Sequence, residues 1–513
     1  MKKLYILIIL ICAVAAGAVV VWLRTNNAKV MVKDYTEVPR TPKIEPDYTE
    51  TVIPPNIAPL NFAVLEPGKH FLVKIYSTNG ETIEVYSKTG KIQIPQKKWK
   101  SLLSANVGKE LYFDVYISDK ANHWGRYKTI TNTIANENID SYIAYRFIKP
   151  LFNWWKDVGV YQRNLENYER TVILHGESFN DGCLNCHTFL NNAPEHMTLG
   201  IRSTTYGSAT LMADKDKVIK IGQKWGYASW HPSGKLVTYS INNVRQFFHK
   251  TMPEIRDVVD LDSAIYYYNV DTRQIKMAAE ISDKDRLETY PTWSPDGKYL
   301  YYCSAPILWE DRETVPPEHY NEVKYDLRRV EYNLETDQWG QPETVLSAEK
   351  TGMSIMLPRI SPNGKFLVFC MCDYGCFPVY QNSSDLYLMN LETGKYEKLP
   401  INSEHSESWH SFSSNSRWLS FSSKRRDGLF TRIYFSYIDK DGRAYKPLIM
   451  PQKDPTYYDS LIKTYSVPEL ITNKVQVSKT ALAKAVRAPE QISMPVTGAT
   501  PALVHTEPWQ ERE

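Results

Sequence analysis

The sequence lacks a strong bias of charge. Lysine and arginine total 61 residues against 58 aspartates and glutamates, which leaves a formal net charge of only +3 over 513 residues. The densest basic run, Lys97, Lys98 and Lys100 around Trp99, is short, and runs of this length are usually solvated faces. We therefore expect no nucleic-acid partner, because nucleic-acid-binding domains concentrate basic residues on one face.

The sequence also lacks the motifs of the common hydrolases and nucleotide-using enzymes. It contains no P-loop and no H-E-x-x-H motif. The segment His175-Gly176-Glu177-Ser178 begins like a G-x-S-x-G nucleophile elbow but has no closing glycine. No catalytic residues of these classes are therefore expected.

A long hydrophobic run opens the chain. Residues 4–23 are apolar and follow Lys2 and Lys3, and this length suffices for a helix to cross a bilayer. We expect residues 1–24 to form an uncleaved, single-pass anchor in an inner membrane. The alternative is a cleaved signal peptide with Ala13-Val14-Ala15 as its cleavage signal.

Two regions of different character follow the anchor. Residues 25–59 include six prolines between Pro39 and Pro59, and this density predicts an extended linker. Residues 60–137 contain short alternating runs, separated by turns such as Asn79-Gly80 and Thr89-Gly90. This second pattern predicts a small β-sandwich with no recognisable catalytic grouping.

Residues 138–195 are expected to be a helical, aromatic-rich segment, and they contain the sharpest chemical motif of the chain, Cys183-Leu184-Asn185-Cys186-His187. In a c-type haem site the two thiols of C-x-x-C-H form thioethers and the histidine ligates the iron. The chain has only 7 cysteines and 11 histidines, so chance rarely produces this spacing. The motif predicts haem c. A Cys183–Cys186 disulfide, a redox pair, or part of a zinc site with His187 are the alternatives.

The motif does not specify a second axial ligand of the iron. Met197 is the first candidate, although an isolated methionine is more often a core residue. A His187/Met197 pair would favour electron transfer over gas binding. Because haem c is attached outside the cytoplasm, the motif and the expected anchor together place the bulk of the chain in the periplasm.

The rest of the chain, residues 196–470, repeats one pattern. An apolar residue is followed by serine or histidine, a turn, and an alternating strand. The four copies are Trp230-His231-Pro232-Ser233-Gly234-Lys235, Trp293-Ser294-Pro295-Asp296-Gly297-Lys298, Ile360-Ser361-Pro362-Asn363-Gly364-Lys365 and Phe412-Ser413-Ser414-Asn415-Ser416-Arg417. Each predicts the inner hairpin of a propeller blade. Five to six blades are expected, the sixth assembled from both chain ends, with insertions at residues 305–325 and 371–384.

The Trp-Ser-Pro-Asp-Gly-Lys unit resembles the repeat of TolB-like β-propellers. Together with the Cys183–His187 motif, it resembles the anchored, haem-motif-bearing TolB-like proteins of the Gram-negative envelope. The resemblance implies a mainly β fold. The resemblance gives little information about function, because such propellers serve as scaffolds, ligand binders and appendages to peptidases.

These observations predict a periplasm-facing, membrane-anchored propeller that carries one haem c and acts by binding an envelope protein partner or passing an electron. The alternatives are a haem-free scaffold or ligand-binding propeller with a Cys183–Cys186 disulfide, and a haem-dependent oxidoreductase. Residues 471–513 are expected to be a poorly ordered tail containing a short helix at Thr480–Arg487.

Overall fold

A computed structural model describes residues 32–149, 157–251, 254–490 and 496–497 of the chain. Within these residues the fold is mainly β, as predicted, and it comprises eight sheets. The expected anchor, residues 1–24, lies outside the described residues. In the described part of the chain, no helix combines the length and apolar character needed to span a bilayer.

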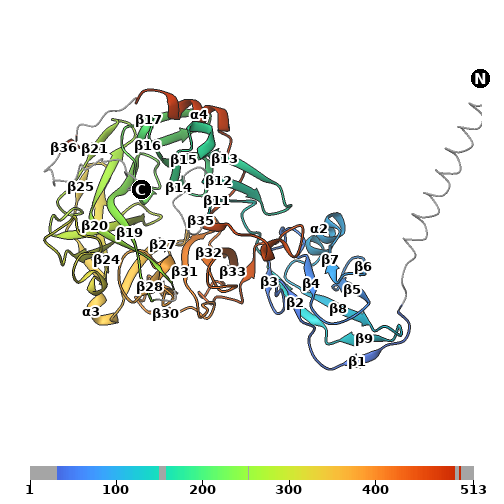
Figure 1. The fold of residues 1–513 in the computed structure, drawn as a ribbon. Helices are drawn as coiled ribbons and strands as arrows, with labels where there is room; N and C mark the ends of the chain where they lie inside the picture. Colours follow the sequence, from blue (N-terminus) through green and yellow to red (C-terminus); the bar gives the residue numbers. More distant parts are fainter. Residues whose placement is uncertain (1–31, 150–156, 252–253, 491–495, 498–513) are drawn as a thin grey trace, which may run out of the picture.

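The N-terminal domain is built from two sheets and one helix (Figure 1). Phe62 of the smaller sheet packs against Phe113 of the larger one, with ring centroids 6.2 Å apart, and Trp99 of the helix lies 6.3 Å from Phe113. The predicted two-sheet packing is therefore present. The larger sheet contains β1 (Thr36–Val38), β3 (Val52–Ile53), β5 (His70–Tyr76), β6 (Ile83–Ser87), β8 (Glu110–Ser118), β9 (Trp124–Tyr127) and β10 (Ile130–Ile134); the smaller contains β2 (Ile44–Glu45), β4 (Phe62–Val64) and β7 (Lys91–Ile92), and the helix is α2 (Gln96–Ser104).

The proline-rich segment is not a free linker, so that prediction is wrong for its described part. Strands β1, β2 and β3 all lie within it, and Tyr48 and Ile53 are buried. Proline is compatible with short edge strands and turns, so a high proline content does not prevent the segment from joining a sheet.

Six further sheets form a β-propeller. The first strands of the six blades contact one another in a closed ring, β14, β18, β22, β27, β31 and β35. The blades are, in order, β14 (Cys183–Leu190), β15 (Ala193–Ser203), β16 (Gly207–Asp214) and β17 (Lys217–Ile221); β18 (Ala228–Trp230), β19 (Leu236–Phe248), β20 (Arg256–Asn269) and β21 (Gln274–Lys276), joined by β36 (Val496–Thr497); β22 (Arg286–Trp293), β23 (Tyr299–Pro306), β24 (Asp326–Asn333), β25 (Gln338–Trp339) and β26 (Glu343–Leu346); β27 (Ser354–Ile360), β28 (Phe366–Cys372), β29 (Asp385–Asn390) and β30 (Tyr396–Lys398); β31 (Glu407–Phe412), β32 (Trp418–Ser423), β33 (Arg432–Tyr437) and β34 (Leu448–Ile449); and β35 (Thr464–Ile471), β11 (Tyr142–Ile148), β12 (Gly159–Asn164) and β13 (Arg170–His175).

The four repeated motifs form the turns between the first and second strands of blades two to five, as predicted. The second residue of each motif donates its backbone N–H to the residue that opens the next strand. These pairs are His231 to Leu236, Ser294 to Tyr299, Ser361 to Phe366 and Ser413 to Trp418. The same hydrogen bond therefore closes every copy of the repeat.

Both ends of the chain build the sixth blade. Strand β35 pairs with β11, which comes more than 300 residues earlier in the chain. The helical interpretation of residues 138–195 is therefore wrong, because β11 to β14 are all strands. Their aromatic residues follow the two-residue period of a sheet: Tyr145 and Phe147 of β11 both pack against Tyr465 of β35.

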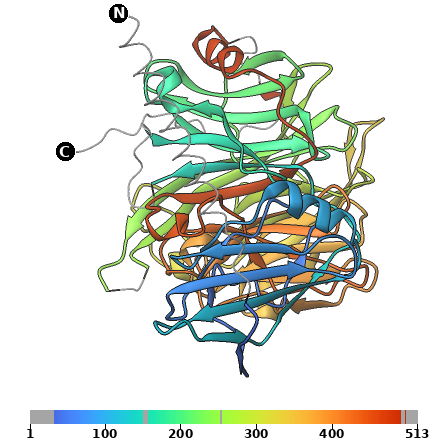
Figure 2. The ribbon, with the colours of Figure 1, turned by 90° about the vertical axis from the view of Figure 1, so that its right-hand side faces the viewer.

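Two contacts fix the outer parts of the propeller. The N-terminal domain packs against the fifth blade, where the Tyr48 hydroxyl donates to the Ile449 carbonyl and the Trp418 indole to the Glu137 carbonyl. The predicted C-terminal helix is α4 (Lys479–Arg487), which contacts β13, β16 and β17. In Figures 1 and 2 this helix (red) lies at the propeller edge away from the N-terminal domain (blue).

Candidate functional site

A bulge recurs on the inner strands of the propeller. At the register shifts of five of these strands, one non-glycine residue adopts a positive φ. These residues are Cys186 (54°), Tyr290 (55°), Leu357 (54°), Trp409 (38°) and Val467 (52°). Bulges turn a side chain out of the regular alternation. The backbone conformation at Cys186 is therefore a property of the propeller repeat and not of the cysteine motif.

His187 follows the bulge of β14 and is buried. It is 3% exposed, and neither of its ring nitrogens makes a well-formed hydrogen bond among the described residues, although the backbone carbonyls of Val467 and Ala144 lie near enough to raise its pKa. Burial, followed by the nearby charge of Arg146, lowers the pKa of His187 to about 3, so the ring is neutral. A neutral imidazole with an unused nitrogen is the form that ligates a metal.

His410 occupies the same position on the fifth inner strand, directly after the bulge at Trp409. It is also buried, but its Nε2 lies 3.0 Å from the Val368 carbonyl oxygen, to which it is hydrogen bonded. Burial lowers its pKa to about 3 as well. The repeat can therefore accommodate a histidine here and satisfy it, which it does not do for His187.

The two cysteines of the motif lie on β14 beside His187. Cys183 is buried and Cys186 is half-buried, and neither thiol takes part in a disulfide. Burial raises the pKa of Cys183, and the charges of Arg202, Arg146 and Lys224 oppose that rise. Both thiols are thus free at the spacing that haem attachment requires.

Three cations surround the thiols without a counter-ion. Arg146, Arg202 and Lys224 make no ion pair and no side-chain hydrogen bond in the described part of the chain. The pKa of Lys224 falls to about 8, first because it is buried and then because Arg202 and Arg146 repel its charge. Half-buried cations without a counter-ion among the described residues favour an anionic ligand.

Met197 lies in the apolar core between the first and sixth blades. It is 1% exposed and stands opposite Phe189 in the β14–β15 ladder, whereas His187 stands opposite Leu199. This is the environment of a core methionine, and its role as an iron ligand stays a prediction. Sequence reasoning missed Arg146, Arg202 and Lys224, because they come from three separate segments and nothing in their local sequence links them to the motif.

No family model matches this chain, and no curated protein matches it either. Solved structures do. The oligogalacturonate lyase of Vibrio parahaemolyticus is 13% identical over 74% of this chain and 100% of its own, with a TM-score of 0.33. Prolyl oligopeptidase B of Galerina marginata is 11% identical over 67% of this chain, which spans 42% of the enzyme, with a TM-score of 0.34.

The hydrazine synthase of Kuenenia stuttgartiensis is 11% identical over 64% of this chain and 74% of its own, with a TM-score of 0.31. At these identities and scores the likenesses carry no argument about activity. The functional reading therefore rests on the site itself.

Proposed function

We propose that this chain is a TolB-like, membrane-anchored propeller of the periplasm that carries one covalent haem c at Cys183, Cys186 and His187, and that it acts by electron transfer or by binding an envelope partner. The observation that carries the proposal is the buried His187, whose two ring nitrogens have no hydrogen-bond partner among the described residues. A buried polar group without a partner costs about 1–3 kcal/mol, so its retention calls for a ligand.

The residues present fit a haem c group. Two free thiols stand at the C-x-x-C-H spacing, and the adjoining imidazole is neutral with its nitrogens unused. The unpaired Arg146, Arg202 and Lys224 suit the two carboxylates that a haem carries. When bound, the haem supplies a one-electron redox centre whose potential depends on its axial ligands and burial.

The chain itself supplies attachment, charge and shielding. Cys183 and Cys186 would hold the group, His187 would orient it, and Arg146, Arg202 and Lys224 would offset the charge of its carboxylates. The walls of the first and sixth blades exclude water from His187. Met197 remains the proposed second axial ligand on sequence grounds, and it would have to leave the core beside Phe189 to serve.

The deciding experiment is a pyridine haemochrome spectrum and a haem stain after denaturing electrophoresis, on the full chain from a host that attaches haem c. The expected result is one covalent haem per chain, absent from the Cys183→Ala, Cys186→Ala variant. A Cys370→Ala, Cys372→Ala variant is the matched control, because it removes two buried thiols outside the motif. Absence of haem from the unmodified chain would leave the haem-free scaffold.

Membrane attachment is tested separately on the same material. The full chain is expected in the inner-membrane fraction and a chain without residues 1–24 in the soluble periplasm. Full-length protein in the soluble fraction would favour the cleaved signal peptide.

A further inference from the structure

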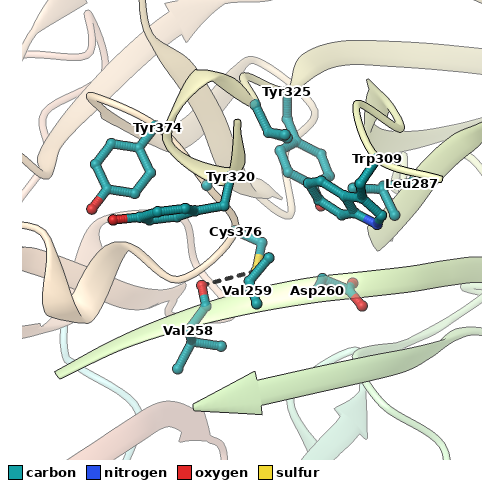
Figure 3. Close-up of a pocket in the computed structure, with 11 residues that line it drawn as sticks. Val258, Val259, Asp260, Leu287, Trp309, Tyr320, Tyr325, Tyr374 and Cys376 are labelled. Carbon is teal, nitrogen blue, oxygen red and sulfur yellow. Dashed lines mark hydrogen bonds between the residues drawn. The ribbon is translucent and has the colours of Figure 1, made fainter. Parts of the chain in front are cut away.

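A second site lies between the second, third and fourth blades. Its floor is β20, and its other walls come from the loops that follow β23 and β28, the two regions predicted as insertions. Figure 3 shows aromatic side chains, among them Trp309, Tyr320 and Tyr325, on one side of this pocket, with Asp260 on the β20 side. The pocket has a volume of about 10 Å³, which is room for one water-sized group, and its lining is mostly apolar.

Asp260 is the unusual member of this pocket. It is 2% exposed, and its Oδ2 accepts a 2.6 Å hydrogen bond from the side-chain amide of Asn242. Its Oδ1 makes no well-formed hydrogen bond, although the Ser263 hydroxyl and the Asp262 backbone N–H lie near enough to lower its pKa, and no cation pairs with the carboxylate in the part of the chain that the structure describes. A carboxylate in this state lacks the partner that burial normally demands.

Tyr325 faces the same pocket with the same deficiency. It is 1% exposed, and its hydroxyl has no partner among the described residues. The pocket thus offers one carboxylate oxygen and one hydroxyl that make no well-formed hydrogen bond among the described residues.

The aromatic walls are held in place by hydrogen bonds at their rims. The Trp309 indole N–H donates to the Leu261 carbonyl at 3.1 Å, and the Tyr374 hydroxyl donates to Asp257 at 2.6 Å. Tyr320 packs edge-on against Tyr374, with centroids 5.9 Å apart. Because the polar groups of Trp309 and Tyr374 are already used, these two residues present their apolar ring surfaces to a ligand. Aromatic rings beside a carboxylate attract a small cation.

We propose that this pocket binds the ammonium head of a small primary amine, which donates hydrogen bonds to Asp260 Oδ1 and the Tyr325 hydroxyl and lies against the aromatic walls. A primary ammonium supplies the N–H donors that both groups lack and the positive charge that Asp260 lacks. Burial raises the pKa of Asp260 to about 7, which is the state of a carboxyl without a cationic partner. The site is independent of haem attachment.

The test uses methylammonium, the smallest primary alkylammonium ion, and saturation-transfer NMR on the full chain. The ligand-efficiency ceiling for a ligand of two heavy atoms puts the expected Kd at about 5 mM or weaker. We expect a saturable methyl signal for the unmodified chain and none for tetramethylammonium, which is bulkier and has no N–H. A chain without a saturable methylammonium signal would show that the pocket holds water only, and would overturn the proposal.

Two variants localise the signal. Asp260→Asn keeps an acceptor for Asn242 but loses the charge, and should weaken binding at least tenfold. Glu288→Gln is the matched control, because Glu288 is an equally buried carboxyl whose pKa is also raised to about 7 and which does not line the pocket. Equal binding by Asp260→Asn and the unmodified chain would place the ligand elsewhere and reject the site.

The variant Tyr325→Phe tests methylammonium binding at this pocket if Asp260→Asn does not fold. Because the buried Tyr325 hydroxyl makes no hydrogen bond to a described residue, its removal should not lower the thermal unfolding temperature. It should weaken methylammonium binding severalfold, and unchanged binding in this variant would contradict the proposal.

Discussion

The inner strands of the first and fifth blades carry a histidine at the same position, and the two histidines differ in their hydrogen bonding. Both histidines follow a bulge with positive φ, and both are buried and neutral. His410 is bonded to the Val368 carbonyl, and its Nδ1 lies 4.0 Å from the Cys370 sulfur. His187 makes no well-formed hydrogen bond among the described residues, two free thiols lie on the same strand, and the charge of Arg146 acts on its ring.

This difference separates what the fold requires from what it does not. The bulge occurs with cysteine, tyrosine, leucine, tryptophan or valine, so the repeat makes no demand for Cys186. It can also satisfy a histidine internally, as at His410. The fold therefore does not require the unpaired polar groups of the first blade. Buried polar groups that the fold does not require are characteristic of functional sites.

The largest expected effect is on the stability of the haem-free chain when each histidine becomes leucine. His410→Leu removes the hydrogen bond to Val368 and should cost about 2 kcal/mol. His187→Leu removes no internal hydrogen bond and replaces an unsatisfied polar ring, so it should stabilise by about 1 kcal/mol. Urea unfolding measures both. Equal losses in the two variants would break the comparison.

The second prediction concerns acid. Both rings have a folded-state pKa of about 3, below the ordinary 6.5, so the folded chain binds fewer protons than the unfolded chain between these values. Each ring's contribution to stability is complete above pH 6.5 and is lost as the pH falls toward 3. Between pH 6.5 and about 5 the loss should approach 2 kcal/mol per ring.

Urea midpoints of the haem-free chain across that pH range measure the loss. His187→Leu should remove one ring's share of the slope and His410→Leu the other. A slope unchanged in His187→Leu would show that its ring is not buried and neutral in solution.

A smaller effect is expected from the cation cluster. Arg202→Gln removes a charge that repels Lys224, so the haem-free chain should gain about 0.5–1 kcal/mol at low salt. The gain should shrink as salt rises, because screening weakens the repulsion. Urea midpoints at two ionic strengths measure it, with the exposed Lys298→Gln as the control. A loss of stability would mean that Arg202 has a counter-ion.

The smallest expected effect on stability comes from an ion pair in the N-terminal domain, between Arg40 and Glu66. Arg40 lowers the pKa of Glu66 to about 2, so this pair stabilises above pH 4.5 and its contribution is lost as the pH falls toward 2. Because the Arg40 side chain is 53% exposed, Glu66→Gln should cost only about 0.5 kcal/mol at neutral pH. The cost should be the same in the His187→Leu background, since the two sites share no partner, and a different cost would show coupling between the domains.

Most of the propeller was predictable because its signal is local. The turn motifs at Trp230, Trp293, Ile360 and Phe412 need only six residues to specify a hairpin, and all four occur as predicted. The sixth blade was less visible, because β11 acquires its partner only when β35 arrives from the far end of the chain. The helical prediction for residues 138–195 is wrong for the same reason: without β35, the sheet face formed by Tyr145 and Phe147 cannot be recognised.

The site was predictable only where it lies in one stretch of sequence. Cys183, Cys186 and His187 form a contiguous motif, but the cations come from β11, β15 and the loop before β18. The pocket at Asp260 has no sequence signature. Whether a buried oxygen has a hydrogen-bond partner depends on its neighbours in the folded chain, which the local sequence does not specify.

The first blade is completed late in synthesis, because its neighbour in the ring of inner strands, β35, comes from the C-terminal part of the propeller. A ribosome makes β14 long before β35, and β35 carries Glu469, whose carboxylate accepts the Phe189 N–H at 2.9 Å, and Val467, whose bulge closes the ring of inner strands beside β14. Until β35 emerges, the wall beside His187 is incomplete. Under the proposed function, an enzyme that modified Cys183 and Cys186 would have its widest access before this strand docks, so modification and folding would compete.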